Sequence, residues 1–267
     1  MKNLAAILVL IVGTGCTSLP EGAPRVSGIS LSPVAVALEV DTRQRLLVSG
    51  AIAGREVDVT HYVKFYTDKP AVAVVDRAGQ VRGVEPGEAV VTAEYGSHTA
   101  QFKLTVKPRA ANQPLSFVND VLPILSKAGC NAGSCHAKPE GQNGFKLSVF
   151  GFDAINDYQA LVMQGRGRRV FPASPEKSLL LLKVSGATPH GGGVRIIPGQ
   201  PAYETLLNWI KAGTPVGSDD DPRVVGIQLF PDQRVVKMTR PQQLQVIASF
   251  SDGRVEDVTR LSSFQTN

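Results

Sequence analysis

The sequence contains few of the residues that form catalytic and metal sites. Among its 267 residues are three Cys, four His and one Trp, and aromatic residues make up only 6%. It has no P-loop, no dinucleotide fingerprint and no Ser–His–Asp arrangement, so no nucleotide-dependent or hydrolytic enzyme is predicted. The Lys and Arg residues form no long run, and the formal net charge of +5 therefore indicates a solvated surface and no nucleic-acid partner.

The apolar run at the N-terminus, from Leu4 to Val12, is too short to span a bilayer. It follows the basic start Met1-Lys2-Asn3 and precedes small residues and Cys16, a pattern that predicts a secretory signal peptide over residues 1–15. A Cys at this place resembles the bacterial lipobox. That resemblance implies that Cys16 is lipidated and that residues 16–24 form a tether to the membrane, with ordinary cleaved secretion as the alternative. We therefore expect an exported protein of the cell envelope, the periplasm or the cell surface.

Residues 25–107 consist of short alternating apolar runs separated by turn signals, with no helical period. We expect strands over residues 34–38, 46–48, 71–75, 89–93 and 102–106. Strands at this spacing predict an all-β sandwich of the immunoglobulin (Ig) type. His61 and His98 lie in this segment without ligand spacing around them, and we interpret both as surface or edge histidines.

An internal repeat connects this segment with the C-terminus. Residues 25–33 (RVSGISLSP) return at 223–231 as RVVGIQLFP, and residues 54–60 (GREVDVT) return at 253–259 as GRVEDVT. The second copy stops at Asn267, whereas the first continues to about Val106. We therefore expect residues 223–267 to be a truncated second sandwich, either in a fragment of a longer protein or with its last strands paired elsewhere.

Both copies resemble the bacterial Ig-like group 2 domain. The resemblance is carried by the stretches GISLSP and GREVDVT and by the run from Lys69 to Gly96, and it covers nearly all of residues 25–107. It implies a module that serves as a surface spacer and, in some members, as part of an adhesin.

The periodicity changes between the two copies, where linkers at 108–114 and 218–222 flank residues 115–217. Two sets of apolar residues at helical spacing lie near the ends of this segment: Phe117, Val121, Ile124 and Leu125, and Tyr203, Leu206, Leu207 and Ile210. Pro123 should kink or shorten the first helix, and Gly213 is a natural end for the second. Residues 178–184 could add one or two helical turns.

The stretch Cys130-Asn131-Ala132-Gly133-Ser134-Cys135-His136 follows the first of these helices. Two cysteines followed directly by a histidine indicate covalent haem attachment, although the usual motif has two residues between the cysteines and this one has four. With "FPASPEKSLLLLKVSG" and "LLNWIKAGTPV", the segment resembles the planctomycete-type cytochrome c domain. The resemblance implies a mainly-α domain over residues 115–217 with one haem c bound through thioethers of Cys130 and Cys135.

Haem iron needs one or two axial ligands from the protein, and His136 is the expected proximal one. The same segment offers His190 and Met163 as candidates for the sixth position, and an open site is the third possibility. His190, which precedes a glycine run, is preferred, and a bis-His iron has a lower potential than a His/Met iron. Arg168 or Arg195 could pair with a haem propionate.

The sequence thus predicts an exported multidomain protein: an all-β Ig-like sandwich, a mainly-α cytochrome c-like domain, and a partial second sandwich. Its expected function is haem binding and electron transfer at the cell envelope, with a redox partner that the sequence does not identify. The main alternative is a cofactor-free surface binding or spacer protein with a Cys130–Cys135 disulfide. A zinc site and a peroxidase with an open sixth position are further alternatives. An enzyme is not favoured, and any catalytic partner domain is expected outside this chain.

Overall fold

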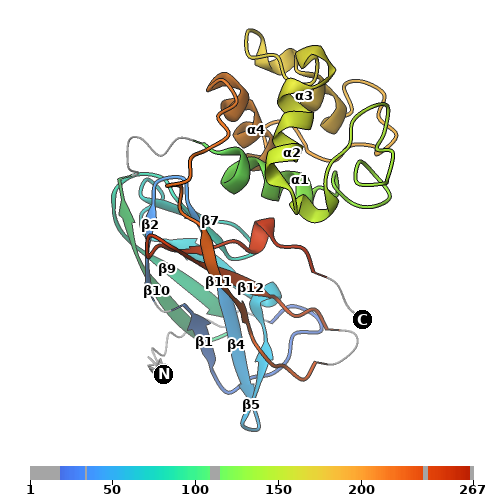
Figure 1. Cartoon of the computed structure of the whole chain (residues 1–267). Helices are drawn as coiled ribbons and strands as arrows, with labels where there is room; N and C mark the ends of the chain where they lie inside the picture. Colours follow the sequence, from blue (N-terminus) through green and yellow to red (C-terminus); the bar gives the residue numbers. More distant parts are fainter. Residues whose placement is uncertain (1–18, 34, 109–114, 237–239, 265–267) are drawn as a thin grey trace. The chain divides into compact units, whose positions relative to one another are not determined.

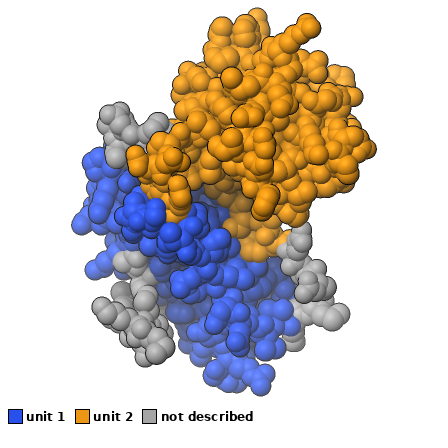
Figure 2. Space-filling model, viewed as in Figure 1, with its two compact units in different colours: residues 1–111, 224–260 blue, residues 112–223, 261–267 orange. Residues whose placement is uncertain are grey.

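A computed structural model describes residues 19–33, 35–108, 115–236 and 240–264. The predicted signal peptide with Cys16, and most of the linker at 108–114, lie outside these residues. The chain divides into two compact units (Figure 2). Residues 1–111 and 224–260 form unit 1, and residues 112–223 and 261–267 form unit 2. No helix among the described residues has the length and apolar character needed to cross a membrane.

The described residues of the first Ig-like copy form ten strands, several of which are labelled in Figure 1. They are β1 (Ile29–Ser32), β2 (Ala35–Glu39), β3 (Arg43–Arg45), β4 (Leu47–Ile52), β5 (Arg55–Asp58), β6 (Lys64–Thr67), β7 (Ala73–Val75), β8 (Gln80–Gly83), β9 (Gly87–Tyr95) and β10 (His98–Lys107). They form three sheets, with strand orders β1-β4-β5, β2-β10-β9-β6 and β3-β8-β7. All pairs are antiparallel except β2 with β10, which is parallel.

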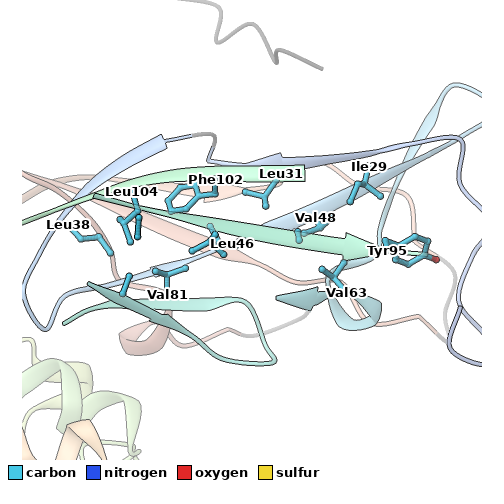
Figure 3. Packing of buried hydrophobic residues seen from close by; sticks show 14 of the residues in the cluster. Ile29, Leu31, Leu38, Leu46, Val48, Val63, Val81, Tyr95, Phe102 and Leu104 are labelled. Carbon is cyan, nitrogen blue, oxygen red and sulfur yellow. The ribbon is translucent and has the colours of Figure 1, made fainter. Parts of the chain in front are cut away.

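The two longest strands show why this segment folds as a sandwich. Side chains along a strand alternate between its faces, and in β10 Phe102, Leu104 and Val106 are buried while the residues between them are exposed. Gly96, at φ +59°, supplies the left-handed backbone of the short turn between β9 and β10. The core packs these strands against β1, β4 and β8, with Leu31, Leu46 and Phe102 at its centre (Figure 3).

The C-terminal β region repeats the first sheet of the sandwich. It contains β11 (Val224–Phe230), β12 (Gln245–Phe250) and β13 (Val255–Asp257) in one antiparallel sheet of order β11-β12-β13. Ile29 pairs with Gly50 and Leu31 with Val48 in the first copy, whereas Ile227 pairs with Ala248 and Leu229 with Val246 in the second. Strands β11, β12 and β13 are thus the counterparts of β1, β4 and β5.

Unit 2 is only partly helical, which is less than the mainly-α domain predicted above. Its helices are a π-helical turn (Phe117–Val121), α1 (Leu122–Lys127), α2 (Ala154–Tyr158), a second π-helical turn (Gln159–Met163), α3 (Leu179–Val184) and α4 (Pro201–Lys211), with single 3-10 turns between them. The helical stretches predicted near residues 117–125, 178–184 and 203–210 are present. Much of the remaining chain in this unit is irregular, because its many glycines favour turns.

The apolar faces predicted for the two end helices form the core of unit 2. Phe117, Leu206, Trp209 and Ile210 are fully buried, and the indole N–H of Trp209 donates to the carbonyl of Pro215 at 2.8 Å. Pro123 sits at the start of α1, where a missing backbone N–H costs nothing. A π-helical turn directly precedes α1, so the interruption that Pro123 predicts lies at the N-terminal end of α1.

Candidate functional site

A cavity of about 430 Å³ in unit 2 brings together most of the residues singled out from the sequence. This is within the range of small-molecule pockets in proteins. Six of the predicted site residues line it: Cys130, Cys135, His136, Arg168, His190 and Arg195. They come from three stretches that are far apart in the chain, so the fold, and not only their spacing, brings them to one place.

The Cys–Cys–His loop is held by its own backbone hydrogen bonds. After α1 the chain turns at Gly129, which has φ +75°, and the N–H of Cys130 donates to the carbonyl of Leu125 at 2.9 Å. The N–H of His136 then donates back to the carbonyl of Cys130 at 3.1 Å. The four residues between the cysteines are therefore taken up in a compact loop that returns His136 to the level of Cys130.

The imidazole of His136 is oriented by a backbone carbonyl. Its Nδ1 lies 3.2 Å from the carbonyl oxygen of Phe145, whose ring also packs against it at 4.6 Å between centroids. An Nδ1–H that donates to a carbonyl leaves Nε2 as the nitrogen available to a metal. Burial, the largest cause, and the nearby His190 and Arg169 lower the pKa of His136, against the opposing effect of the Phe145 carbonyl, so the neutral, metal-binding form is favoured.

His190 is held in the same way from the other side of the cavity. Its Nδ1 lies 2.9 Å from the carbonyl oxygen of Gly193, in a turn closed by the N–H of Gly193 on the carbonyl of His190. A Cβ at Gly192 would come within 2.9 Å of the His190 ring, so the glycine run gives the ring its space. The resulting tautomer again leaves Nε2 for a ligand.

The imidazole rings of His136 and His190 lie close to each other in the cavity. Their planes are within 11° of parallel and their centroids are 6.4 Å apart. An imidazole binds a metal through a nitrogen lone pair in the plane of its ring, so two histidines at about 2 Å from a shared metal have centroids about 6 Å apart when both ring edges point at that metal. The two histidines therefore supply the donor type and the centroid separation of a bis-His iron.

The two cysteines are free thiols in this structure and both are partly buried. Burial, which Arg195 opposes, raises the pKa of Cys130 to about 11. Among the described residues no group of three or more His, Cys, Asp and Glu side chains comes together around a metal position. Haem iron does not need such a group, because the porphyrin supplies four of its ligands and the protein adds only one or two.

Arg168 and Arg195 line the cavity, and within the described part of the chain neither has a carboxylate at ion-pair distance. Both cations are thus available to an anionic group of a ligand. Met163, the alternative sixth ligand, is 67% exposed and does not line the cavity. Of the two candidates for the distal position, only His190 lines the cavity.

Sequence reasoning missed two residues of this site, Arg169 and Phe145. The guanidinium of Arg169 is buried, donates to the carbonyls of Ala160 at 2.8 Å and Gly144 at 2.7 Å, and stacks 4.7 Å from the Phe145 ring. Arg169 thus connects three segments of the cavity wall. A Cβ at Gly165 would come within 2.8 Å of this guanidinium. The glycine before the arginines was therefore the one sequence signal that could have pointed to a packed Arg169.

Comparison with known families identifies the first copy. Residues 25–106 match the family described as "Bacterial Ig-like domain (group 2)". The chain thus carries a bacterial Ig-like module, and the predicted sandwich is confirmed for this segment. No cytochrome c family model matches the chain, and no match was found among the curated proteins.

Solved structures give distant likenesses only. Domains 5–6 of the S-layer protein SbsC are 18% identical, with 35% of this chain and 48% of that chain covered and a TM-score of 0.28. An intimin mutant from EHEC O157:H7 is 14% identical, with 36% and 56% covered and a TM-score of 0.26. The chain thus spans about half the length of each of these structures, and at such scores the likeness supports no conclusion about fold or function.

Proposed function

We propose that this chain is an exported cell-surface protein in which Ig-like modules act as a spacer for the domain between them. The family match over residues 25–106 carries this proposal, and the signal-peptide pattern over residues 1–15 supports it. The surface role was the alternative of the sequence analysis. The comparisons agree with it better than with electron transfer, because they identify an Ig-like module and no cytochrome.

The surface role is tested on bacterial cells that express the full chain. We expect labelling by a membrane-impermeant biotin reagent, recovery in the membrane fraction and incorporation of a lipid precursor at Cys16. A Cys16→Ala variant should lose the lipid and leave the membrane fraction, while Cys130→Ala should behave as the parent chain does. Recovery of the parent chain in the cytoplasm would contradict the proposal.

The second candidate function is haem binding with electron transfer, and the placement of the His136 and His190 imidazoles in one cavity, 6.4 Å apart, favours it. In this proposal His136 and His190 hold the iron, Cys130 and Cys135 provide covalent attachment, and Arg168 and Arg195 bind propionates. A haem at this site would supply one-electron transfer at its iron, and the chain would contribute ligation, orientation and partial burial. The two functions are compatible, since a surface spacer can carry a redox domain.

Absorption spectroscopy separates the two candidates. The full chain is co-expressed with cytochrome c maturation factors in the periplasm, purified and denatured. A haem band that stays with the denatured chain, and is lost in Cys130→Ser with Cys135→Ser, supports covalent haem. A colourless chain with a Cys130–Cys135 disulfide would contradict haem binding, and the surface role would be the remaining candidate.

The axial assignment has its own test. His190→Ala should lose the low-spin spectrum, whereas Met163→Ala should keep it, because Met163 is exposed away from the cavity. The parent spectrum should also lack the weak sulfur-to-iron band in the red. An unchanged spectrum in His190→Ala would overturn the bis-His assignment.

A further inference from the structure

The two Ig-like copies contact each other in unit 1 through residues that correspond in sequence. The N–H of Val48 donates to Thr60 Oγ1 at 2.8 Å, and the N–H of Val246 donates to Thr259 Oγ1 at 2.8 Å, so Val48 and Val246 are equivalent positions. Counting back along each strand makes Arg45 equivalent to Gln243 and Gln44 equivalent to Gln242. Asp58 and Asp257 correspond likewise, since each accepts from the N–H of the threonine two residues later.

The hydrogen bonds between the copies are reciprocal. Asp257 of the second copy accepts from the backbone N–H of Arg45 and from the side chain of Gln44, the latter at 3.2 Å. Asp58 of the first copy accepts from the backbone N–H of Gln243 and from the side chain of Gln242, the latter at 3.3 Å. Exchanging the two copies converts the first pair of hydrogen bonds into the second. This is the pattern of an isologous contact with local two-fold symmetry.

Each half of this contact is also fixed within its own copy. The Gln44 amide donates to the carbonyl of Arg45 at 3.0 Å, and the Gln242 amide donates to the carbonyl of Gln243 at 2.8 Å. Gln44 is only 4% exposed, as is expected of a polar side chain whose bonds are made inside a contact. Hydrogen bonds to an ionised carboxylate are stronger than neutral ones, so two such acceptors suit a specific interface.

We propose that this surface is a self-recognition site of the Ig-like repeat, whose partner is another copy of the same module. We call it the reciprocal clamp; it consists of Gln44, Arg45 and Asp58 on one side and Gln242, Gln243 and Asp257 on the other. In this chain it joins the first and second copies. Because the copies flank residues 112–223, the clamp holds both ends of this segment on unit 1, and it restricts the segment as a closed loop does.

An ion pair beside the clamp provides a charge that can be reversed. Arg234 of the second copy lies 3.0 Å from Glu56 of the first and 3.4 Å from the hydroxyl of Ser49. The Arg234 side chain is 17% exposed and that of Glu56 is 62% exposed, so this pair alone contributes little. Like charges at the same place would nevertheless repel and weaken the contact.

The test uses the full chain with a protease site introduced between residues 109 and 114. After cleavage the two pieces should co-elute in size-exclusion chromatography at micromolar concentration. Asp257→Ala should raise the dissociation constant of the pieces at least tenfold. Asp252→Ala is the matched control, since this acid of the same copy pairs with Arg254 at 2.6 Å and, among the described residues, with no side chain of the first copy.

Charge reversal keeps the test independent of folding losses in Asp257→Ala. Glu56→Arg should weaken the association, and adding Arg234→Glu to the same chain should restore it. Parent pieces that separate after cleavage would overturn the proposal. So would equal dissociation constants for Asp257→Ala and Asp252→Ala, or a failure of the double charge reversal to restore binding.

Discussion

The two Ig-like copies have the same local structure and very different burial. Strands β1 and β11 pair with their neighbours in the same register, yet Ile29 and Leu31 are each 7% exposed, whereas Ile227 and Leu229 are 67% and 43% exposed. In the first copy the sheet β2-β10-β9-β6 covers β1, and Phe102 and Leu104 of β10 lie in the same core as Ile29 and Leu31. Local sequence is therefore enough to set strand pairing, while burial depends on the second sheet.

The largest expected effect comes from removing the same leucine side chain from each copy. Leu31→Ala should destabilise the first copy by about 2–5 kcal/mol, because it leaves a cavity in a packed core. Leu229→Ala should cost at most about 1 kcal/mol, because its side chain is already 43% exposed. Hydrogen exchange of peptides from β4 and β12 measures the two copies separately. Equal losses would show that β11 is covered in solution.

A smaller effect is expected where a glycine in one copy is an alanine in the other. A Cβ at Gly50 would lie 2.5 Å from Cγ1 of Val26, so Gly50→Ala should cost about 1–3 kcal/mol through overpacking. The equivalent Ala248 is buried, and Ala248→Gly should cost about 0.5–1 kcal/mol through added backbone freedom. The same exchange measurement applies, and a stabilising Gly50→Ala would contradict the packing described for β4.

The two copies should respond equally to mutation where their local contacts are the same. Thr60 and Thr259 each accept the backbone N–H of their valine at 2.8 Å and are each buried. Thr60→Val and Thr259→Val should each cost about 1–3 kcal/mol, because the buried N–H loses its partner. Thr60→Ser and Thr259→Ser are the controls, since they keep the hydroxyl. A large loss in only one copy would mean that the two turns are not equivalent.

The sequence predicted those parts of the fold that depend on local pattern. Alternation located β9 and β10, and the repeat anticipated the shared register of the two copies. The expected strands left out β1, β3, β6 and β8. Strands β3 and β8 were missed because Arg43–Arg45 and Gln80–Gly83 contain few apolar residues and become strands through pairing with each other. The parallel pairing of β2 with β10 is set by contacts distant in sequence, which no local pattern reveals.

The residues of the candidate site fall into the same two groups: those that a local sequence pattern indicates and those that depend on the folded structure. Cys130, Cys135 and His136 were found because they are adjacent in the sequence, and His190 was found because the segment holds few possible ligands. Arg169 and Phe145 were missed, since their role arises from backbone carbonyls and ring packing that appear only after the loops are folded. Met163, the alternative sixth ligand, lies in the second π-helical turn, is exposed and does not line the cavity.

Burial also separates two histidines, and this gives the smallest predicted effect. The pKa of His136 is lowered mainly by burial, whereas His61 is exposed in a 3-10 turn of unit 1. An unfolded histidine has a pKa of about 6.5, so below that pH the unfolded chain binds a proton that folded His136 does not. The stability of haem-free unit 2 should therefore fall as the pH drops below about 6.5, until the pH passes the folded pKa of His136.

Urea unfolding followed by Trp209 fluorescence at pH 7.5 and 5.5 measures this loss of stability. His136→Gln should reduce the difference in stability between the two pH values, and His61→Gln should leave that difference unchanged. A difference that is the same in the parent chain and in His136→Gln would place the proton uptake on another group.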